Sequence, residues 1–263
     1  MSALSSGPPI VALRKVGKAF ASGVVALDRF DFDVHPGEFV SVLGPSGCGK
    51  STALRIIAGL SEPTAGTVAW SQGQGVDAEN SRGIGFVFQE PTLMPWATVA
   101  ANVRLPLKLR GLIAKAQPRV DAALVRVGLS GFSGSYPREL SGGMKMRASI
   151  ARALVTEPRL LLMDEPFAAL DEITRFRLNN DLLALWQSLG KTVVFVTHSV
   201  FESVYLSQRI IIMTPRPGRV FAELAIEAPY PRDERFRTSA DYAGYCRRVS
   251  EALTRATAEA GAA

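Results

Sequence analysis

One short stretch restricts the fold of this chain more than any other. Residues 44–51 read GPSGCGKS, which matches the phosphate-binding pattern G-x-x-x-x-G-K-[ST]. An apolar run at 39–43 precedes them, and an apolar-periodic segment at 53–60 follows. We therefore predict a buried strand, a glycine-rich loop and a helix in this order, which is the arrangement in which a helix N-terminus binds phosphate.

The residue types of this loop suit a polyphosphate. Gly44, Gly47 and Gly49 permit backbone conformations that turn successive N–H groups toward one anion. Lys50 supplies a positive charge for the outer phosphates, and the Ser51 hydroxyl is a ligand for Mg²⁺. The other loop positions expected to contact a nucleotide are Pro45, Ser46, Cys48 and Thr52. The alternative, an accidental match of a glycine-rich turn, is expected in about one of a hundred chains of this length.

Cysteine usage and the N-terminal residues favour a reducing cytoplasm. Cys48 and Cys246 do not suggest a disulfide framework. Residues 1–9 lack the features of a secretory signal, and no apolar run reaches the length of about 18 residues that a membrane span needs. Because Cys48 lies beside Lys50 at a predicted helix start, we expect a reactive thiol that bound nucleotide protects.

Short apolar segments alternate with helix-period segments, which predicts an α/β fold with a mostly parallel sheet around a P-loop NTPase core. The turn at 21–23 joins the first two strands, which predicts an antiparallel β part at the N-terminus. The predicted strands are 10–20, 26–34, 39–43, 67–70, 84–88, 159–163 and 192–197, and a helix is predicted at 171–189.

The segment 91–155 interrupts the alternation, because its apolar residues have helical spacing with breaks at Pro106, Pro118 and Pro137. We interpret it as an inserted α-helical subdomain. The predicted organisation is a disordered lead at 1–9, one domain at 10–230 and a C-terminal extension at 231–263. Within the domain we predict a polar surface loop at 71–81 and a late hairpin at 209–213 and 220–226. The extension is predicted to begin as a charged loop and to contain a helix at about 239–258.

Positive charge is concentrated in the middle of the chain. Residues 90–159 carry 11 Lys and Arg against 4 Asp and Glu, whereas the whole chain has a formal net charge of +6. A basic segment suits nucleic acid, an anionic membrane surface or a protein partner. Solvated helix faces have the same composition, so charge alone does not choose among these interpretations.

Two carboxylates follow the apolar run 160–163. In a parallel sheet the carboxyl ends of the strands face the ligand crevice. Asp164 is therefore a candidate Mg²⁺ ligand, and Glu165 is a candidate for orienting or deprotonating an attacking water. A strand end with exposed acids is the alternative, and the loop at 44–51 favours the functional interpretation.

A second predicted helix start is also rich in glycine. Ser141 is a good N-cap, but Gly142 and Gly143 lower the helix propensity of the first turn. Exposed backbone N–H groups that approach an anion would explain this choice, so we predict a second helix-end phosphate site. A cap with a flexible turn is the alternative.

These features resemble the ATPase subunits of ABC transporters over about residues 10–215. Six motifs occur in the family's order and approximate spacing: 44–52, Gln89, 140–144, 160–166, 169–171 and 197–198. The resemblance implies that residues 10–230 form a single ABC ATPase domain, which binds ATP and Mg²⁺ and hydrolyses ATP to ADP and phosphate. In that reaction Lys50 and His198 stabilise the developing charge, while Glu165 positions the water.

The resemblance also implies roles for three single residues. Phe20 occupies the position of an aromatic that stacks on adenine, although a strand-core Phe would have the same sequence signature. Gln89 resembles the loop glutamine that touches Mg²⁺ and senses the partner, and His198 resembles the switch histidine near the γ-phosphate. Ser199 departs from the family, in which many members have Asp, and this weakens a support of the site.

The partners implied by the resemblance are protein subunits at a membrane. Two copies form a homodimer head to tail, so that each loop at 44–52 faces the partner's 141–143 segment across ATP, with Asp171 at the seam. Closing of this dimer would drive two transmembrane permease subunits. We therefore expect a peripheral protein at the cytoplasmic face of the inner (plasma) membrane, served indirectly by an extracytoplasmic solute-binding protein.

Segments 93–103, 143–147 and 216–220 resemble importer ATPases of the nitrate/sulfonate/taurine type more closely. Leu93, Met94 and Trp96 would then line the groove for a permease helix, with ordinary subdomain core as the alternative. The alternative function is an ABC-type ATPase acting on nucleic acid. The chain lacks the sustained heptads of the coiled coils in chromosome and repair members, so we expect no nucleic-acid partner.

Overall fold

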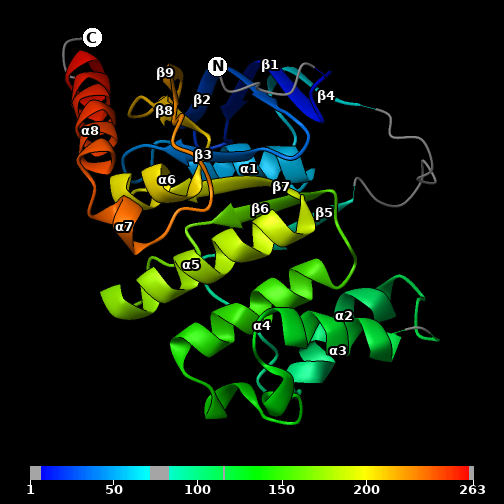
Figure 1. Ribbon diagram of the computed structural model, residues 1–263. Coiled ribbons are helices and arrows are strands. Elements are labelled where there is room, and N and C mark those ends of the chain that lie inside the picture. Colours follow the sequence, from blue (N-terminus) through cyan, green and yellow to red (C-terminus); the bar gives the residue numbers. More distant parts are fainter. Residues whose placement is uncertain (1–6, 72–82, 115, 261–263) are drawn as a thin grey trace. The chain divides into compact units, whose positions relative to one another are not determined.

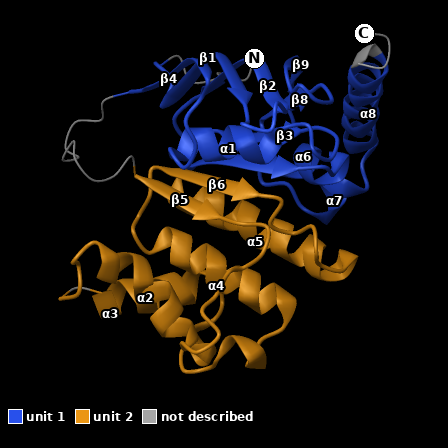
Figure 2. Ribbon diagram, turned by 180° about the vertical axis from the view of Figure 1, so that it is seen from behind, with its two compact units in different colours: residues 1–77, 192–263 blue, residues 78–191 orange. Residues whose placement is uncertain are grey.

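The computed structural model describes residues 7–71, 83–114 and 116–260 (Figure 1). The chain divides into two compact units, Met1–Asp77 with Thr192–Ala263 as unit 1 and Ala78–Lys191 as unit 2 (Figure 2). Most of the predicted lead at 1–9 and of the predicted loop at 71–81 lies outside the described residues.

Unit 1 begins with the predicted antiparallel part. Strand β1 (Val11–Ala19) pairs antiparallel with both β2 (Val25–Val34) and β4 (Ala65–Trp70). The apolar pattern of β2 is irregular. Leu27 and Phe30 are three positions apart and would face opposite sides of a regular strand, yet both are buried. Between them Arg29 has a φ of +48°, and the register with β1 shifts there, so a bulge restores the buried face.

The second sheet region of unit 1 is mostly parallel, as predicted. Strand β3 (Phe39–Leu43) lies between β7 (Thr192–Thr197) and β8 (Arg209–Met213), and it pairs parallel with both. Every residue of these three strands is buried, which is typical of parallel strands covered on both faces. Strand β9 (Val220–Ala225) pairs antiparallel with β8 and confirms the predicted hairpin.

Three helices of unit 1 pack against these strands: α1 (Lys50–Ala58), α6 (Val200–Leu206) and α8 (Ala240–Ala260). The sequence predicted α1 and α8 but not α6. A further short helix, α7 (Glu234–Arg237), lies in what was expected to be a charged loop. Helix α8 contacts α6, β8 and β9, so the C-terminal extension belongs to unit 1.

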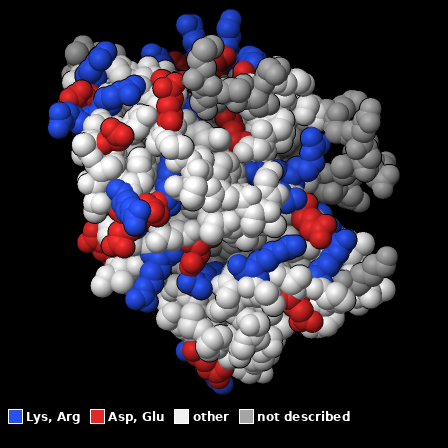
Figure 3. Space-filling model, in the orientation of Figure 1, with Lys and Arg blue, Asp and Glu red and all other residues white. Residues whose placement is uncertain are grey.

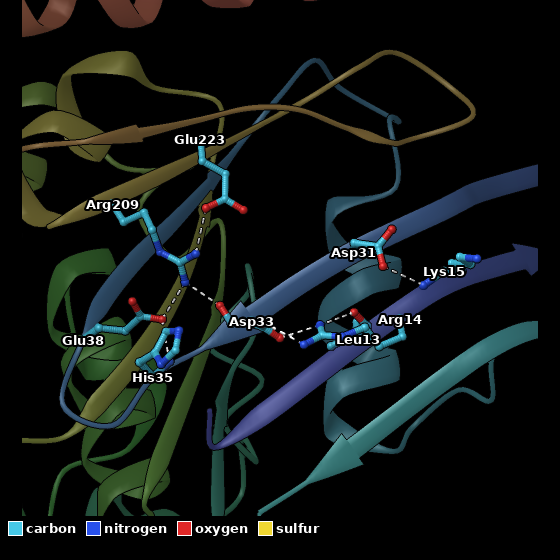
Figure 4. Close-up of polar contacts among 9 residues, drawn as sticks. All are labelled: Leu13, Arg14, Lys15, Asp31, Asp33, His35, Glu38, Arg209 and Glu223. Atoms are coloured by element: carbon cyan, nitrogen blue, oxygen red, sulfur yellow. Dashed lines mark hydrogen bonds and ion pairs between the residues drawn. The ribbon is translucent and has the colours of Figure 1, made fainter. Parts of the chain in front are cut away.

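A buried arginine connects the two sheet regions of unit 1 (Figure 4). Arg209 on β8 donates to Glu38 Oε1 at 2.8 Å, to Glu223 Oε2 at 3.0 Å and to the carbonyl oxygen of Asp33 on β2. The Asp33 carboxylate in turn forms an ion pair of 2.6 Å with Arg14 on β1. Removing one partner of such a buried pair costs about 3–5 kcal/mol, because the other charge stays buried without compensation.

Unit 2 contains two parallel strands and a group of helices. Strand β5 (Ile84–Val87) pairs parallel with β6 (Leu160–Asp164). The predicted break at Pro106 is wrong, because Pro106 lies inside a helix, which loses one backbone hydrogen bond there and ends at Leu109. The helices are α2 (Val99–Leu109), α3 (Ala116–Arg126), α4 (Gly142–Leu154) and α5 (Glu172–Leu189), with 3-10 turns at Ser130–Phe132 and Pro137–Glu139.

The surface shows both charge signs interspersed over the visible face (Figure 3). Part of the positive charge of residues 90–159 is used within unit 2. Arg147 forms an ion pair of 2.5 Å with Asp181, and Arg152 donates to backbone carbonyls of Pro91 and Thr92. In the part of the chain that the structure describes, no helix is both long and apolar enough to cross a membrane.

Candidate nucleotide-binding site

The glycine-rich loop leads from β3 into α1, as the sequence predicts. Gly49 is the N-cap of α1 with a φ of +111°, and no side chain forms a capping hydrogen bond there. A Cβ at this position would lie 2.6 Å from the carbonyl oxygen of Ala26 and 2.9 Å from Leu27 Cδ2. Glycine is therefore required twice, by the left-handed backbone and by the close approach of β2.

Two side chains of the loop point inward. Lys50 is buried, and its Nζ donates to the carbonyl oxygens of Gly44 and Pro45, both at 2.9 Å, so a full positive charge is held against the loop backbone. Cys48 is only 1% exposed. This burial counts against ready access of a reagent to the sulfur, and the reactivity of the Cys48 thiol stays a prediction.

The turn between β8 and β9 supports the loop from behind, which the sequence did not reveal. Arg216 donates to the carbonyl oxygen of Gly47 through Nε at 3.2 Å and Nη2 at 3.1 Å. Gly218 donates to the Ala26 carbonyl, and a Cβ on Gly218 would lie 2.2 Å from the carbonyl oxygen of Cys48. The segment 216–218, Arg-Pro-Gly, predicts the turn of the hairpin but not its contact with the phosphate loop.

His198 lies at the same edge of the sheet as this loop. In the parallel pairing of β3 with β7, Leu43 is opposite Thr197, so Gly44 and His198 each begin the segment that follows its strand. His198 itself is exposed. The structure thus brings together, within unit 1, two candidate groups that are more than 140 positions apart in the sequence.

The residues that flank His198 are tightly bonded. The Ser199 N–H donates to Thr197 Oγ1 at 3.0 Å, and Thr197 Oγ1 donates to Glu202 Oε2 at 2.5 Å. Ser199, which departs from the family pattern, caps α6 by accepting from the Glu202 N–H at 3.3 Å. The four-residue pattern Ser-x-x-Glu at 199–202 is a helix-start signature that predicts α6, and it was overlooked.

Phe20 lies at the turn between β1 and β2 and is 45% exposed. Lys18 Nζ lies over the Phe20 ring, 5.5 Å from its centroid. The alternative interpretation, a strand-core Phe, is therefore wrong, and the ring is accessible to a planar ligand.

The two acidic candidates lie in unit 2 at the end of β6. Asp164 is the last residue of the strand and is buried. Glu165 follows with a φ of +45°, a conformation that non-glycine residues seldom adopt. Backbone strain of this kind is found preferentially at functional sites, where the surrounding structure holds it in place.

Gln89 follows β5, the strand that pairs with β6. Val87 is opposite Met163 in this parallel pair, so Gln89 and Asp164 follow neighbouring strand ends within unit 2. Arg152 on α4 fixes the segment after Gln89, since its guanidinium donates to the carbonyl oxygens of Thr92 at 2.7 Å and Pro91 at 2.8 Å. Burial lowers the pKa of Arg152 from its ordinary value.

The second glycine-rich helix start is also in unit 2. Ser141 Oγ accepts from the Met144 N–H at 3.3 Å and caps α4. A Cβ on Gly143 would lie 2.8 Å from Thr174 Cγ2 on α5, so packing requires glycine at this position. Gly142 is exposed, and a Cβ there would only approach Leu170 Cδ2 at 3.2 Å. The sequence predicts an anion-binding role for both glycines, and it does not reveal that packing against Thr174 requires Gly143.

Asp171 caps α5 next to this helix start. Its Oδ1 accepts from the Thr174 N–H at 2.9 Å, and this backbone hydrogen bond lowers the pKa of the Asp171 carboxyl. The site residues thus form two sets, each positioned within its own unit. Unit 1 holds Phe20, the loop at 44–52 and His198; unit 2 holds Gln89, Ser141, Gly142, Gly143, Asp164, Glu165 and Asp171.

Comparison with known proteins decides the family. The sequence profile of the ABC transporter family matches residues 27–168. An ABC transporter ATP-binding protein of Methanocaldococcus jannaschii is 46% identical over 246 residues, which are 92% of this chain and 89% of that protein. This chain belongs to the ABC transporter ATP-binding family. It is an ATPase subunit, and the predicted family, fold class and enzyme type are confirmed.

Two further comparisons describe this ATPase subunit more closely. An aliphatic sulfonates import ATP-binding protein of Bacillus cereus is 43% identical over 231 residues, covering 85% of this chain and 89% of the relative. Among solved structures, a dimeric ATP-binding cassette in a post-hydrolysis state with ADP and phosphate has a TM-score of 0.71 and 36% identity, covering 83% of this chain and 100% of that one. The similarity to the aliphatic sulfonates import protein agrees with the predicted importer subfamily.

Proposed function

We propose that this ATPase subunit couples ATP hydrolysis to solute import of the nitrate/sulfonate/taurine type, or to the import of a related small organic solute. The observation that carries the proposal is the pairing of β3 with β7, which puts the glycine-rich loop and His198 at one sheet edge. The 43% identity to an aliphatic sulfonates import protein supports the solute class.

In this proposal each candidate residue has one role. The loop N–H groups and Lys50 bind the outer phosphates of ATP, and Phe20 stacks on the adenine. Glu165 orients and deprotonates the attacking water, while Lys50 and His198 stabilise charge on the transferred phosphoryl group.

Ser51, Gln89 and Asp164 supply hydroxyl, amide and carboxylate oxygens, which are the ligands that Mg²⁺ prefers. The buried position of Asp164 at a strand end fits this role, since one or two carboxylates and the substrate phosphates commonly hold Mg²⁺. When bound, Mg²⁺ would neutralise part of the phosphate charge.

A second copy completes the site in this proposal. Two chains pair head to tail, and the partner subunit's Ser141, with the exposed N–H of the adjacent glycine, contacts the γ-phosphate. The exposed position of Gly142 and the dimeric state of the similar cassette support this arrangement. An isolated chain should therefore bind ATP but hydrolyse it poorly.

The remaining partners are two transmembrane permease subunits, with an extracytoplasmic solute-binding protein acting through them. The chain would then be a peripheral protein at the cytoplasmic face of the plasma membrane. Trp96, which is 76% exposed, is the strongest candidate for contact with a permease helix, together with Leu93 and Met94. An exposed large aromatic is typical of a protein-interaction site.

The decisive test of the mechanism is Glu165→Gln. We expect this variant to bind ATP normally and to accumulate as an ATP-bound dimer, while turnover falls by about a hundredfold or more, because the water loses its base. ATP binding, dimerisation by light scattering and phosphate release are measured together. Glu157→Gln is the matched control, since Glu157 is also a glutamate with positive φ in unit 2; Glu157 is exposed, whereas Glu165 is half-buried.

Undiminished phosphate release by Glu165→Gln would contradict the assigned role. The solute class is tested separately, by the growth of a deletion strain with sulfonates or taurine as sole sulfur source or nitrate as sole nitrogen source. Co-purification with hydrophobic membrane subunits tests the transport assignment, and salt-sensitive binding to nucleic acid without such subunits would favour the alternative function.

A further inference from the structure

The helix that follows His198 packs on β3 and β7 and is also bonded to the C-terminal extension. Helix α6 starts two residues after His198, and with only seven residues it has little stability of its own. Its last carbonyl groups have no partner inside the helix, as at every helix C-terminus. These groups must be satisfied from elsewhere in the chain.

Arg232 satisfies them. This residue is only 4% exposed, and its Nη1 donates to the carbonyl oxygens of Val204 at 2.9 Å, Tyr205 at 3.0 Å and Ser207 at 2.8 Å. Its Nη2 donates to carbonyl oxygens further along, of Ile226 at 3.3 Å and Ala228 at 3.0 Å. A buried cation at a helix C-terminus also interacts favourably with the helix dipole.

Three tyrosine hydroxyls strengthen the same connection. Tyr230 donates to the Leu206 carbonyl at 2.9 Å, and Tyr205 on α6 donates to the carbonyl of Arg232 at 2.9 Å. Near the start of α6, Tyr242 on α8 donates to the Phe201 carbonyl at 3.0 Å. The extension therefore bonds to both ends of α6.

The first turn of α6 transmits this constraint to His198. Thr197 and Ser199, its two neighbours in sequence, bond to Glu202 of α6 and to each other. His198 thus lies between β7, which is fixed in the sheet, and α6, which the extension fixes. A shift of α6 would move the backbone of His198.

We propose that residues 228–246 form a positioning clamp for His198, with Arg232 as its central positioning residue. The clamp touches no nucleotide; it holds α6 so that the His198 imidazole meets the transferred phosphoryl group in one orientation. This inference rests on the proposed role of His198. It assigns a task in the ATPase reaction to a segment that follows the last strand of the sheet.

A double-mutant cycle on the full chain tests the clamp. We expect Arg232→Met to lower kcat about tenfold with KM for ATP changed less than about twofold, because misplacing one catalytic group slows the chemical step while the phosphate loop still binds. His198→Ala should lower kcat about a hundredfold. In the His198→Ala background Arg232→Met should have less than about twofold further effect, since there is no imidazole left to position.

The outcomes of the cycle distinguish failure of the clamp from failure of the role proposed for His198. Equal losses from Arg232→Met with and without His198 would overturn the clamp and leave the proposed function intact. Undiminished kcat in His198→Ala would overturn the role of His198 and the clamp together. An unchanged kcat in Arg232→Met alone would overturn the clamp. Arg247→Met, at an exposed arginine on α8 just outside residues 228–246, is the control and should change kcat less than about twofold.

A milder variant keeps the inference testable if Arg232→Met fails to fold. Tyr242→Phe removes the hydroxyl that bonds to Phe201, and we expect a loss in kcat of about threefold, again absent in the His198→Ala background. Hydrogen exchange gives an independent reading: the α6 amides should exchange faster in both variants, while α1 amides are unchanged. Unchanged α6 exchange with Tyr242→Phe at full kcat would also overturn the clamp.

Discussion

Two helices of this ATPase subunit, α1 and α4, have glycine at their starts, as the N-cap Gly49 of α1 and as the first residues Gly142 and Gly143 of α4, and for different reasons. At α1 the backbone itself requires glycine, because Gly49 has a φ of +111° and no side chain caps the helix. At α4 the cap is an ordinary one: Ser141 is extended, with a φ of −66°, and its hydroxyl accepts from the third residue of the helix.

The difference shows that one residue type answers three separate constraints. Gly49 is fixed by conformation and by the approach of the Ala26 carbonyl. Gly143 is fixed by a side chain on α5, whereas a Cβ on Gly142 would meet only the end of the Leu170 side chain, at 3.2 Å, and that end would have to shift slightly. Contacts within the chain explain Gly49 and Gly143, but they do not require glycine at position 142. Gly142 is therefore the better candidate for contact with a partner's nucleotide.

Gly49→Ala, at the N-cap of α1, should have the largest effect on stability and on ATP binding. We expect it to lower the free energy of unfolding by about 3 kcal/mol and to abolish ATP binding, because backbone strain and a clash with the Ala26 carbonyl combine. Gly37→Ala is the control, since Gly37 has a φ of +74° but open space, and should cost about 1 kcal/mol. Urea unfolding measures both, and equal losses would rule out the clash.

Gly143→Ala should have the next largest effect, and it acts through packing. We expect a loss of about 2 kcal/mol, since the added methyl meets Thr174 Cγ2. Adding Thr174→Ser removes that methyl and should restore most of the stability while keeping the hydroxyl. Failure of the second substitution to restore the midpoint of urea unfolding would show that backbone conformation, not packing, requires glycine here.

Gly142→Ala should separate stability from turnover. Alanine favours a helix by up to about 1 kcal/mol over glycine, and the end of the Leu170 side chain can move away, so we expect unchanged or slightly higher stability. Turnover should fall about tenfold, because the methyl would cover an N–H that faces the partner's nucleotide. Full phosphate release at unchanged stability would contradict the second phosphate site.

A third helix start gives the smallest effect, one that depends on pH. A backbone hydrogen bond from Thr174 lowers the pKa of Asp171 below its ordinary value of 3.8. The folded state therefore gains stability from this carboxylate at pH values above about 4 and loses it as the pH falls through the lowered pKa. Asp171→Asn keeps the cap, so urea midpoints of the two proteins should differ less at low pH than at neutral pH. A difference that stays constant with pH would exclude this carboxylate as the cause.

Much of the fold was predictable because local patterns specified it. The fully buried strands β3, β7 and β8 were visible as apolar runs, and the hairpin β8–β9 as two runs around a Pro-Gly turn. The candidate loop and the strand-end acids were likewise readable, since their residue types follow from the chemistry of phosphate and Mg²⁺.

The features that the sequence did not reveal have physical reasons of a different kind. The bulge at Arg29 and the continuous helix through Pro106 depend on neighbouring elements that override local preference. The burial of Cys48 follows from the packing of the loop against the β8–β9 turn, a contact between segments about 170 positions apart. No local pattern records such a contact.

The sequence by itself determined the loop, the strand that feeds it and the acids at the end of β6, because each is a contiguous pattern with its own chemistry. Only the tertiary structure decided that His198 and the phosphate loop follow their strands at the same edge of the sheet. It also decided that Arg232 caps the C-terminus of α6, the helix after His198. Both relations depend on parallel pairing and on backbone carbonyls, which every residue carries. Side-chain identity therefore leaves little trace of them in the sequence.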